Sequence, residues 1–145
     1  MAFSKFYAFD ALAGVLKRDV GLAALTSDGY VGTQWDQGAA ALTDCILVIN
    51  VESIDVAGTD EIYNFRVVGS NVADRSDGEV LAERVLGHIT AIPGPETVTT
   101  AAGDQHVVPF RTEKNGTAFR YIDLHLDVTG ATASIGFNAF ISKEI

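Results

Sequence analysis

Residues 119–128 read Phe-Arg-Tyr-Ile-Asp-Leu-His-Leu-Asp-Val, which is the clearest alternation of apolar and polar residues in the chain. Successive side chains of a β-strand point to opposite faces of its sheet. Ile122, Leu124, Leu126 and Val128 therefore share one face, and the polar residues between them share the other. The stretch predicts an antiparallel strand that is buried on one face and solvated on the other.

Strand patterns continue on both sides of this stretch, in segments 45–51, 62–68, 80–92, 105–111 and 134–142. The first is β-branched and apolar, which suits a strand buried on both faces. In the third, strand and helix periods compete, and we favour a strand that ends before Pro93. The Asn115-Gly116 pair predicts a tight hairpin turn between 105–111 and 119–128. Short strands at regular spacing favour a β-sandwich or a barrel.

The first thirty residues are predicted to form an extended or partly helical N-terminal arm, and residues 31–145 the β-sandwich, within a single domain overall. Phe9, Leu12 and Leu16 fit a helical spacing that Gly14 and Gly21 weaken. Ser27-Asp28-Gly29 marks a turn, and residues 37–41 are expected to separate Trp35 from the first strong apolar strand. We expect the arm either to dock on a neighbouring protein or to fold back on its own core.

Composition excludes several classes of protein. The 145 residues are 48% hydrophobic and 20% charged, which is typical of one globular domain. A net charge of -9 would repel nucleic-acid phosphates, so no nucleic-acid partner is expected. Charged residues interrupt the N-terminal apolar stretch, so no membrane segment or signal peptide is expected. Cys45 lies in an apolar run and is predicted to be a buried thiol in a protein made in a reducing cytoplasm.

One group of residues fits a metal-binding pattern. Asp123, His125 and Asp127 share a strand face and could ligate a metal ion, but a straight strand spreads its ligands along a line. A solvated strand face is the interpretation we favour. The chain contains neither a nucleophile elbow nor a phosphate-binding loop. We therefore expect no enzymatic activity, no cofactor and no metal.

Binding or structural roles remain, and aromatic residues outside the clear strands are the candidate contacts. The candidates for contact with a partner protein or another subunit are Phe3, Phe6, Tyr7, Phe9, Tyr30 and Trp35. Ordinary packing of these aromatic side chains in the core is the alternative.

Several segments, in their order, resemble the small capsid cement (decoration) proteins of tailed bacteriophages. The segments that carry the resemblance are Asp10-Ala11-Leu12, Thr33–Gly38, Cys45–Val51, Phe65–Asn71, Leu86-Gly87-His88, Arg120-Tyr121-Ile122 and Ala131–Ser142. The resemblance spans nearly the whole chain. It rests on the order and residue types of these segments rather than on a catalytic motif. Residues 14–25 depart most from the family's pattern.

The resemblance implies a jelly-roll-like antiparallel β-sandwich that assembles as a homotrimer on the outer surface of a phage head. There it would bind and stabilise the lattice of the major capsid protein, and the six aromatic residues named above would be candidates for capsid or subunit contact. Another virion structural part, such as a tail or head-completion protein, is one alternative function. A carbohydrate-binding β-sandwich module is another.

Overall fold

A computed structural model describes residues 7–8, 15–93 and 98–144 of the chain, and all regular structure in them is β. The strands are β1 (Tyr7–Ala8), β2 (Leu16–Arg18), β3 (Gly29–Ala41), β4 (Asp44–Ile54), β5 (Ile62–Ser70), β6 (Glu79–Gly87), β7 (Gln105–Arg111), β8 (Glu113–Lys114), β9 (Thr117–Thr129) and β10 (Ile135–Glu144). Within these residues there is no helix that could span a membrane.

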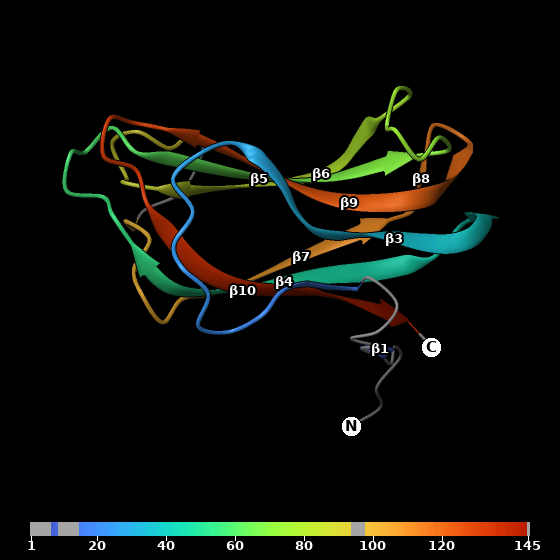
Figure 1. The fold of residues 1–145 in the computed structure, drawn as a ribbon, viewed down its shortest axis with the longest axis horizontal. Helices are drawn as coiled ribbons and strands as arrows, with labels where there is room; N and C mark the ends of the chain where they lie inside the picture. The colour runs from blue at the N-terminus through green and yellow to red at the C-terminus, as the bar shows by residue number, and fades with distance from the viewer. Residues whose placement is uncertain (1–6, 9–14, 94–97, 145) are drawn as a thin grey trace.

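The strands form two antiparallel sheets stacked as a sandwich (Figure 1). The first, called here the β10 sheet, has the order β1-β10-β4-β7, and β2 also pairs with β10. The second, called the β9 sheet, has the order β3-β9-β5-β6, and β8 pairs with the start of β9. The predicted all-β sandwich is confirmed at this level of architecture.

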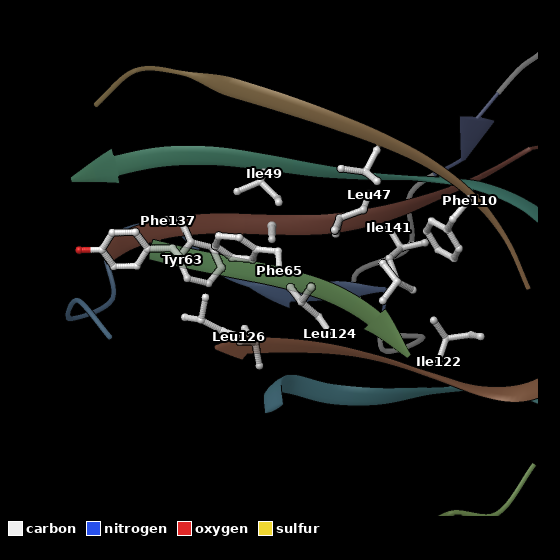
Figure 2. Close-up of a cluster of buried hydrophobic side chains, with 14 of the residues drawn as sticks. Leu47, Ile49, Tyr63, Phe65, Phe110, Ile122, Leu124, Leu126, Phe137 and Ile141 are labelled. Atoms are coloured by element: carbon white, nitrogen blue, oxygen red, sulfur yellow. The ribbon is translucent and has the colours of Figure 1, made fainter. Parts of the chain in front are cut away.

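The apolar faces of the two sheets meet in one core, and Figure 2 shows a cluster of its buried side chains. Ile122, Leu124 and Leu126 of β9 are fully buried there, so the strand predicted from residues 119–128 is confirmed together with the direction of its apolar face. Phe65 of β5 and Phe137 of β10 contact each other across the core, edge to face, with ring centroids 4.9 Å apart. This geometry is the one that aromatic pairs prefer.

The hairpin prediction is right about the turn and wrong about one of its strands. Asn115 and Gly116 both have positive φ, as a tight turn of this kind requires. However, β9 pairs through this turn only with the two-residue β8, while β7 pairs with β4 in the other sheet. The chain changes sheets at Thr112, which is fully buried and whose hydroxyl donates to the carbonyl oxygen of Ala41.

Strand β3 was not predicted, because its residues do not alternate. Its register against β9 shifts between Val31 and Trp35 and again between Asp36 and Ala41. Gly32 has φ +74°, and a Cβ atom there would lie 2.1 Å from the carbonyl oxygen of Lys17. The segment 37–41, predicted to be a separator, is therefore the end of an irregular edge strand.

Two other boundaries also differ from prediction. Strand β6 ends at Gly87 rather than near Ile92, because the amides of Ala91 and Ile92 both donate to the carbonyl oxygen of His88 in a turn. Within the range predicted as an arm, β1 and β2 pair with β10, and β3 begins at Gly29. The described part of that range, 7–8 and 15–30, contains strands and no helix.

Candidate interaction surfaces

The outer face of the β10 sheet carries a row of apolar side chains, one from each of four strands. Phe140 of β10 pairs with Leu16 of β2 on one side and with Val48 of β4 on the other, and Val48 pairs with Val107 of β7. Their neighbours along each strand, such as Leu47, Ile49 and Ile141, face the core. We call Leu16, Phe140, Val48 and Val107 the apolar row.

Two further apolar residues widen this surface. Ile46 lies two residues before Val48 on β4 and pairs with Pro109 of β7. Val107 is 49% exposed, whereas Val48 at the centre of the row is only 5% exposed. The low exposure of Val48 agrees with the prediction that segment 45–51 is buried on both faces. The outer side of a solvated antiparallel sheet is normally polar, so the apolar row is a candidate interaction surface.

A ladder of amides flanks the apolar row. The side chain of Asn50 donates to that of Asn138 at 2.9 Å and accepts from Gln105 at 2.8 Å, so three adjacent strands are joined. Asn138 also donates to Glu52 at 3.3 Å. Because these side chains already bond to one another, they hold the row in a fixed shape.

The outer face of the β9 sheet is different, because paired charges cover it. Arg66 contacts Glu83 at 3.2 Å and Asp127 at 2.5 Å. Arg75 holds both carboxylate oxygens of Asp123, at 2.9 and 3.0 Å. Farther along the strand, Arg120 holds Asp36 in the same two-bond manner. We call this surface the ion-pair face.

The three residues considered as metal ligands lie on the ion-pair face with other partners. Asp123 bonds to Arg75 and to the amide of Gln34, and Asp127 bonds to Arg66. His125 contacts the ring of Tyr30 edge to face, with centroids 4.9 Å apart. Across the described residues, no group of three His, Cys, Asp or Glu side chains is arranged to hold a metal ion.

The expectation that this strand face is solvated needs a correction. Asp123 is only 2% exposed. Arg75, which lies in the connection between β5 and β6, reaches over the sheet and covers the carboxylate. Alternation predicted the face to which Asp123 points, but not the loop that covers it.

The predicted contact residues do not gather in one place. Trp35 is 3% exposed and packs in the core, so its side chain does not lie on the surface and the alternative of ordinary core packing holds. Tyr30 is 45% exposed and lies on the ion-pair face. Tyr7 belongs to β1, whose backbone pairs with the end of β10 in the other sheet. Phe3, Phe6 and Phe9 lie outside the described residues.

Two buried cations on β2 fix the edge of the sandwich. The ammonium group of Lys17 donates to the carbonyl oxygens of Thr33 at 2.8 Å and Ile122 at 3.1 Å, both in the β9 sheet. Burial lowers the pKa of Lys17 to about 8, although Asp123 opposes the shift. Arg18 lies 4.9 Å from the ring centroid of Phe137 and donates to that residue's carbonyl oxygen at 3.3 Å. Strand β2 thus joins both sheets.

The apolar row was not predicted, because the pairing of its residues depends on strand register. Leu16 and Phe140 are 124 positions apart in the chain, yet they are directly paired. The available signal was the run 45–51 itself, because a strand with two buried faces implies that something packs on its outer side.

Comparisons with protein-family models, with curated proteins and with solved structures found no match to this chain.

Proposed function

We propose that this protein is a capsid decoration, or cement, protein that binds the outer surface of a phage head as homotrimers and stabilises the lattice of the major capsid protein. The observation that carries the proposal is the apolar row on the outer face of the β10 sheet. The likeness of the sequence to cement proteins supports the same conclusion independently.

We also infer that the sandwich is a jelly roll. Rolling up one long antiparallel hairpin pairs the first strand with the last, the second with the last but one, and so on inward. Apart from the two-residue β1 and β8, the pairs here nest in that way: β2 with β10, β3 with β9, β4 with β7 and β5 with β6. This nesting supports the finer assignment of the fold that the resemblance implies.

The apolar row has the chemistry of a docking surface for a protein. Val107 and Pro109 are exposed on β7, and Ile46 lies beside them. A standard interface takes about 800 Å² from each partner. The accessible surface of this chain is 7364 Å², so one such contact would use about a tenth of it. A capsid contact and the two different contacts that each subunit makes in a trimer could therefore coexist.

A cement protein must also resist deformation, since it transmits load between capsid subunits. Lys17 and Arg18 tie one edge of the sandwich to both sheets, and the amide ladder ties three strands of the β10 sheet together. These bonds connect segments distant in the chain, which favours a scaffold that is already rigid before it docks. Repetition over a lattice would then convert weak single contacts into high avidity.

The test uses heads of the parent phage prepared without the protein, to which purified variants are added. Val107→Asp places a charge in the apolar row at a position that is half exposed, so the fold should tolerate it. The matched control is Val98→Asp, because Val98 is 70% exposed in the connection between β6 and β7.

We expect Val107→Asp to reduce binding to heads by at least about tenfold, since burying an aspartate removes the contact of a valine side chain and adds a desolvation cost. Val98→Asp should bind as the parent protein does, and both variants should unfold at the parent temperature. Co-sedimentation measures occupancy, and heat-induced bursting measures reinforcement. Full occupancy by Val107→Asp, or heads equally robust without the protein, would contradict the proposal.

A further inference from the structure

A hollow of about 250 Å³ lies on the ion-pair face, on the opposite side of the sandwich from the apolar row. Its lining includes Tyr30, Arg66, Val68, Arg75, Val80 and His125. These residues come from four strands and the connection between β5 and β6, and pairing brings them together. Tyr30 pairs with His125, and His125 pairs with Arg66.

The two arginines of the hollow are held in place and still have donors left. Arg75 lies 4.0 Å from the ring centroid of Tyr30 and uses Nε and Nη2 to hold Asp123. Arg66 uses Nε and Nη1 to hold Glu83 and Asp127. A guanidinium carries five N–H groups, so these bonds do not exhaust the donors of either side chain. The carboxylates beside them supply acceptors with spare lone pairs.

The charges of the hollow argue against an anionic ligand. Two arginines face four carboxylates: Glu79 lines the hollow, and Asp123, Asp127 and Glu83 hold the arginines. The whole chain carries a net charge of -9. Phosphate, sulfate or an acidic sugar would be repelled by these carboxylates, whose negative charge exceeds the positive charge of the two arginines. A neutral ligand rich in hydroxyl groups would instead use donors and acceptors together and would bring no charge.

Apolar surface lies between these polar groups. Tyr30 is 45% exposed and Val80 is 40% exposed, and Val80 pairs with Val68 on the neighbouring strand. A sugar ring combines hydroxyl edges with apolar C–H faces, so it matches a site that offers both. Ligand pockets usually measure about 300 to 1,000 Å³. This hollow is smaller, which suits a single sugar unit rather than a long chain.

From this arrangement we infer that the hollow binds one neutral sugar unit of a glycan. Tyr30 and Val80 contact the C–H face of the ring, and Arg66, Arg75 and their carboxylate partners bond its hydroxyl groups. The inference does not depend on the capsid function, because the isolated protein carries the whole hollow. Since the apolar row lies on the other sheet, sugar and capsid would not compete.

The test is titration of the ¹⁵N-labelled protein with glucose, galactose, mannose and N-acetylglucosamine, followed by amide NMR. Sodium sulfate and sialic acid serve as anionic probes. We expect at least one neutral sugar to shift the amide signals around Tyr30, Arg66 and His125 with saturation in the millimolar range. A glycan array extends the search to larger neutral glycans.

Tyr30→Ala should weaken the binding of that sugar by about tenfold, because it removes the aromatic contact. The matched control is Tyr121→Ala. Tyr121 lies on the same outer face of the β9 sheet as Tyr30, but it lies beside Arg120 rather than in the hollow. Val80→Trp should also abolish binding by filling the hollow, and it leaves Tyr30 and both arginines in place.

Amide spectra that match the parent protein establish that each variant is folded. Absence of shifts and of array signals with every neutral sugar would overturn the inference, and so would saturable binding of sulfate or sialic acid alone. Equal loss of binding in Tyr30→Ala and Tyr121→Ala would also overturn it, because the contact would then not lie in the hollow. Capsid binding by the same variants is measured separately and tests only the proposed function.

Discussion

Lys17 gives the sharpest prediction about stability, because it is a buried cation that bonds to no carboxylate among the described residues. It is 2% exposed, and both hydrogen bonds that the structure gives its ammonium group go to backbone carbonyl oxygens. Burial lowers the pKa from an ordinary value of 10.5 to about 8. One pKa unit corresponds to about 1.4 kcal/mol, so keeping this lysine charged in the folded state costs about 3 kcal/mol at neutral pH.

The sign of the pH dependence follows from the two protonation states. Between pH 8 and pH 10.5 the unfolded chain binds a proton at Lys17 that the folded chain has lost. The free energy of unfolding therefore rises with pH through this window, and about 2.5 kcal/mol of the cost is recovered between pH 7 and pH 10. Burial also raises the pKa of the Cys45 thiol to about 12, and that contribution lowers stability as pH rises above 9.

A difference measurement separates the two effects. Urea unfolding of the parent and of Lys17→Met is compared from pH 7 to pH 10, and Cys45 is the same in both proteins. The parent should gain about 2.5 kcal/mol relative to the variant over this range. The two lost hydrogen bonds add an offset that does not vary with pH. A matched variant, Lys114→Met, removes a lysine that is 41% exposed and controls for the loss of a lysine side chain as such. A difference between the parent and Lys17→Met that does not change with pH would refute the assignment of a buried, destabilised cation.

Three further predictions concern single features of the fold. Gly32→Ala should lower the free energy of unfolding, measured with urea, by more than Gly38→Ala does. Both glycines have positive φ, but only at Gly32 would a Cβ atom lie against backbone, 2.1 Å from the carbonyl oxygen of Lys17. Equal losses of stability would contradict this close contact. Asp123→Ala should cost about 2 to 3 kcal/mol of unfolding free energy, because the carboxylate that it removes is only 3% exposed and holds Arg75. Asp44→Ala should cost less than about 1 kcal/mol, because Asp44 is 29% exposed and its partner Arg111 is 55% exposed. Similar values would show that the Asp123 pair behaves as a surface pair. Deletion of residues 2–9 should weaken binding to phage heads while the amide spectrum of the sandwich stays intact; unfolding of the truncated chain would instead place the arm in the core.

Alternation along single strands allowed much of the fold to be predicted. Strands β5, β7, β9 and β10 all lie within or close to their expected segments, because each buries one face and alternates accordingly. Strand β3 did not follow this rule, since positive φ at Gly32 and Gly38 breaks its register against β9. The partner of β7 was also missed, because the change of sheet occurs at a single buried threonine, Thr112, which no periodicity marks.

The candidate surfaces were less predictable than the strands. Alternation places His125 on the polar face of β9, but it cannot indicate that Tyr30 and Arg66 flank it. These two residues precede His125 in the chain by 95 and 59 positions, and only strand pairing brings them together. Charge composition did not predict the ion-pair face either. Taken together, the 19 acidic residues predict a surface that repels anions. Several of them, however, are paired with arginines on the ion-pair face. Register, rather than composition, decides where a ligand could find compensated charge.

The two outer faces of the sandwich differ in a way that determines how the protein would sit on a shell. Transfer of Val107 and its neighbours from water into an interface is favourable, whereas burial of the paired charges around Arg66 would require their desolvation. Docking through the apolar row would leave Arg66, Arg75 and Tyr30 in solvent. The reverse orientation would desolvate the paired charges and would gain nothing from the apolar row, which would stay in water. The orientation that would favour the proposed capsid binding would therefore also keep the hollow on the ion-pair face accessible to the proposed sugar.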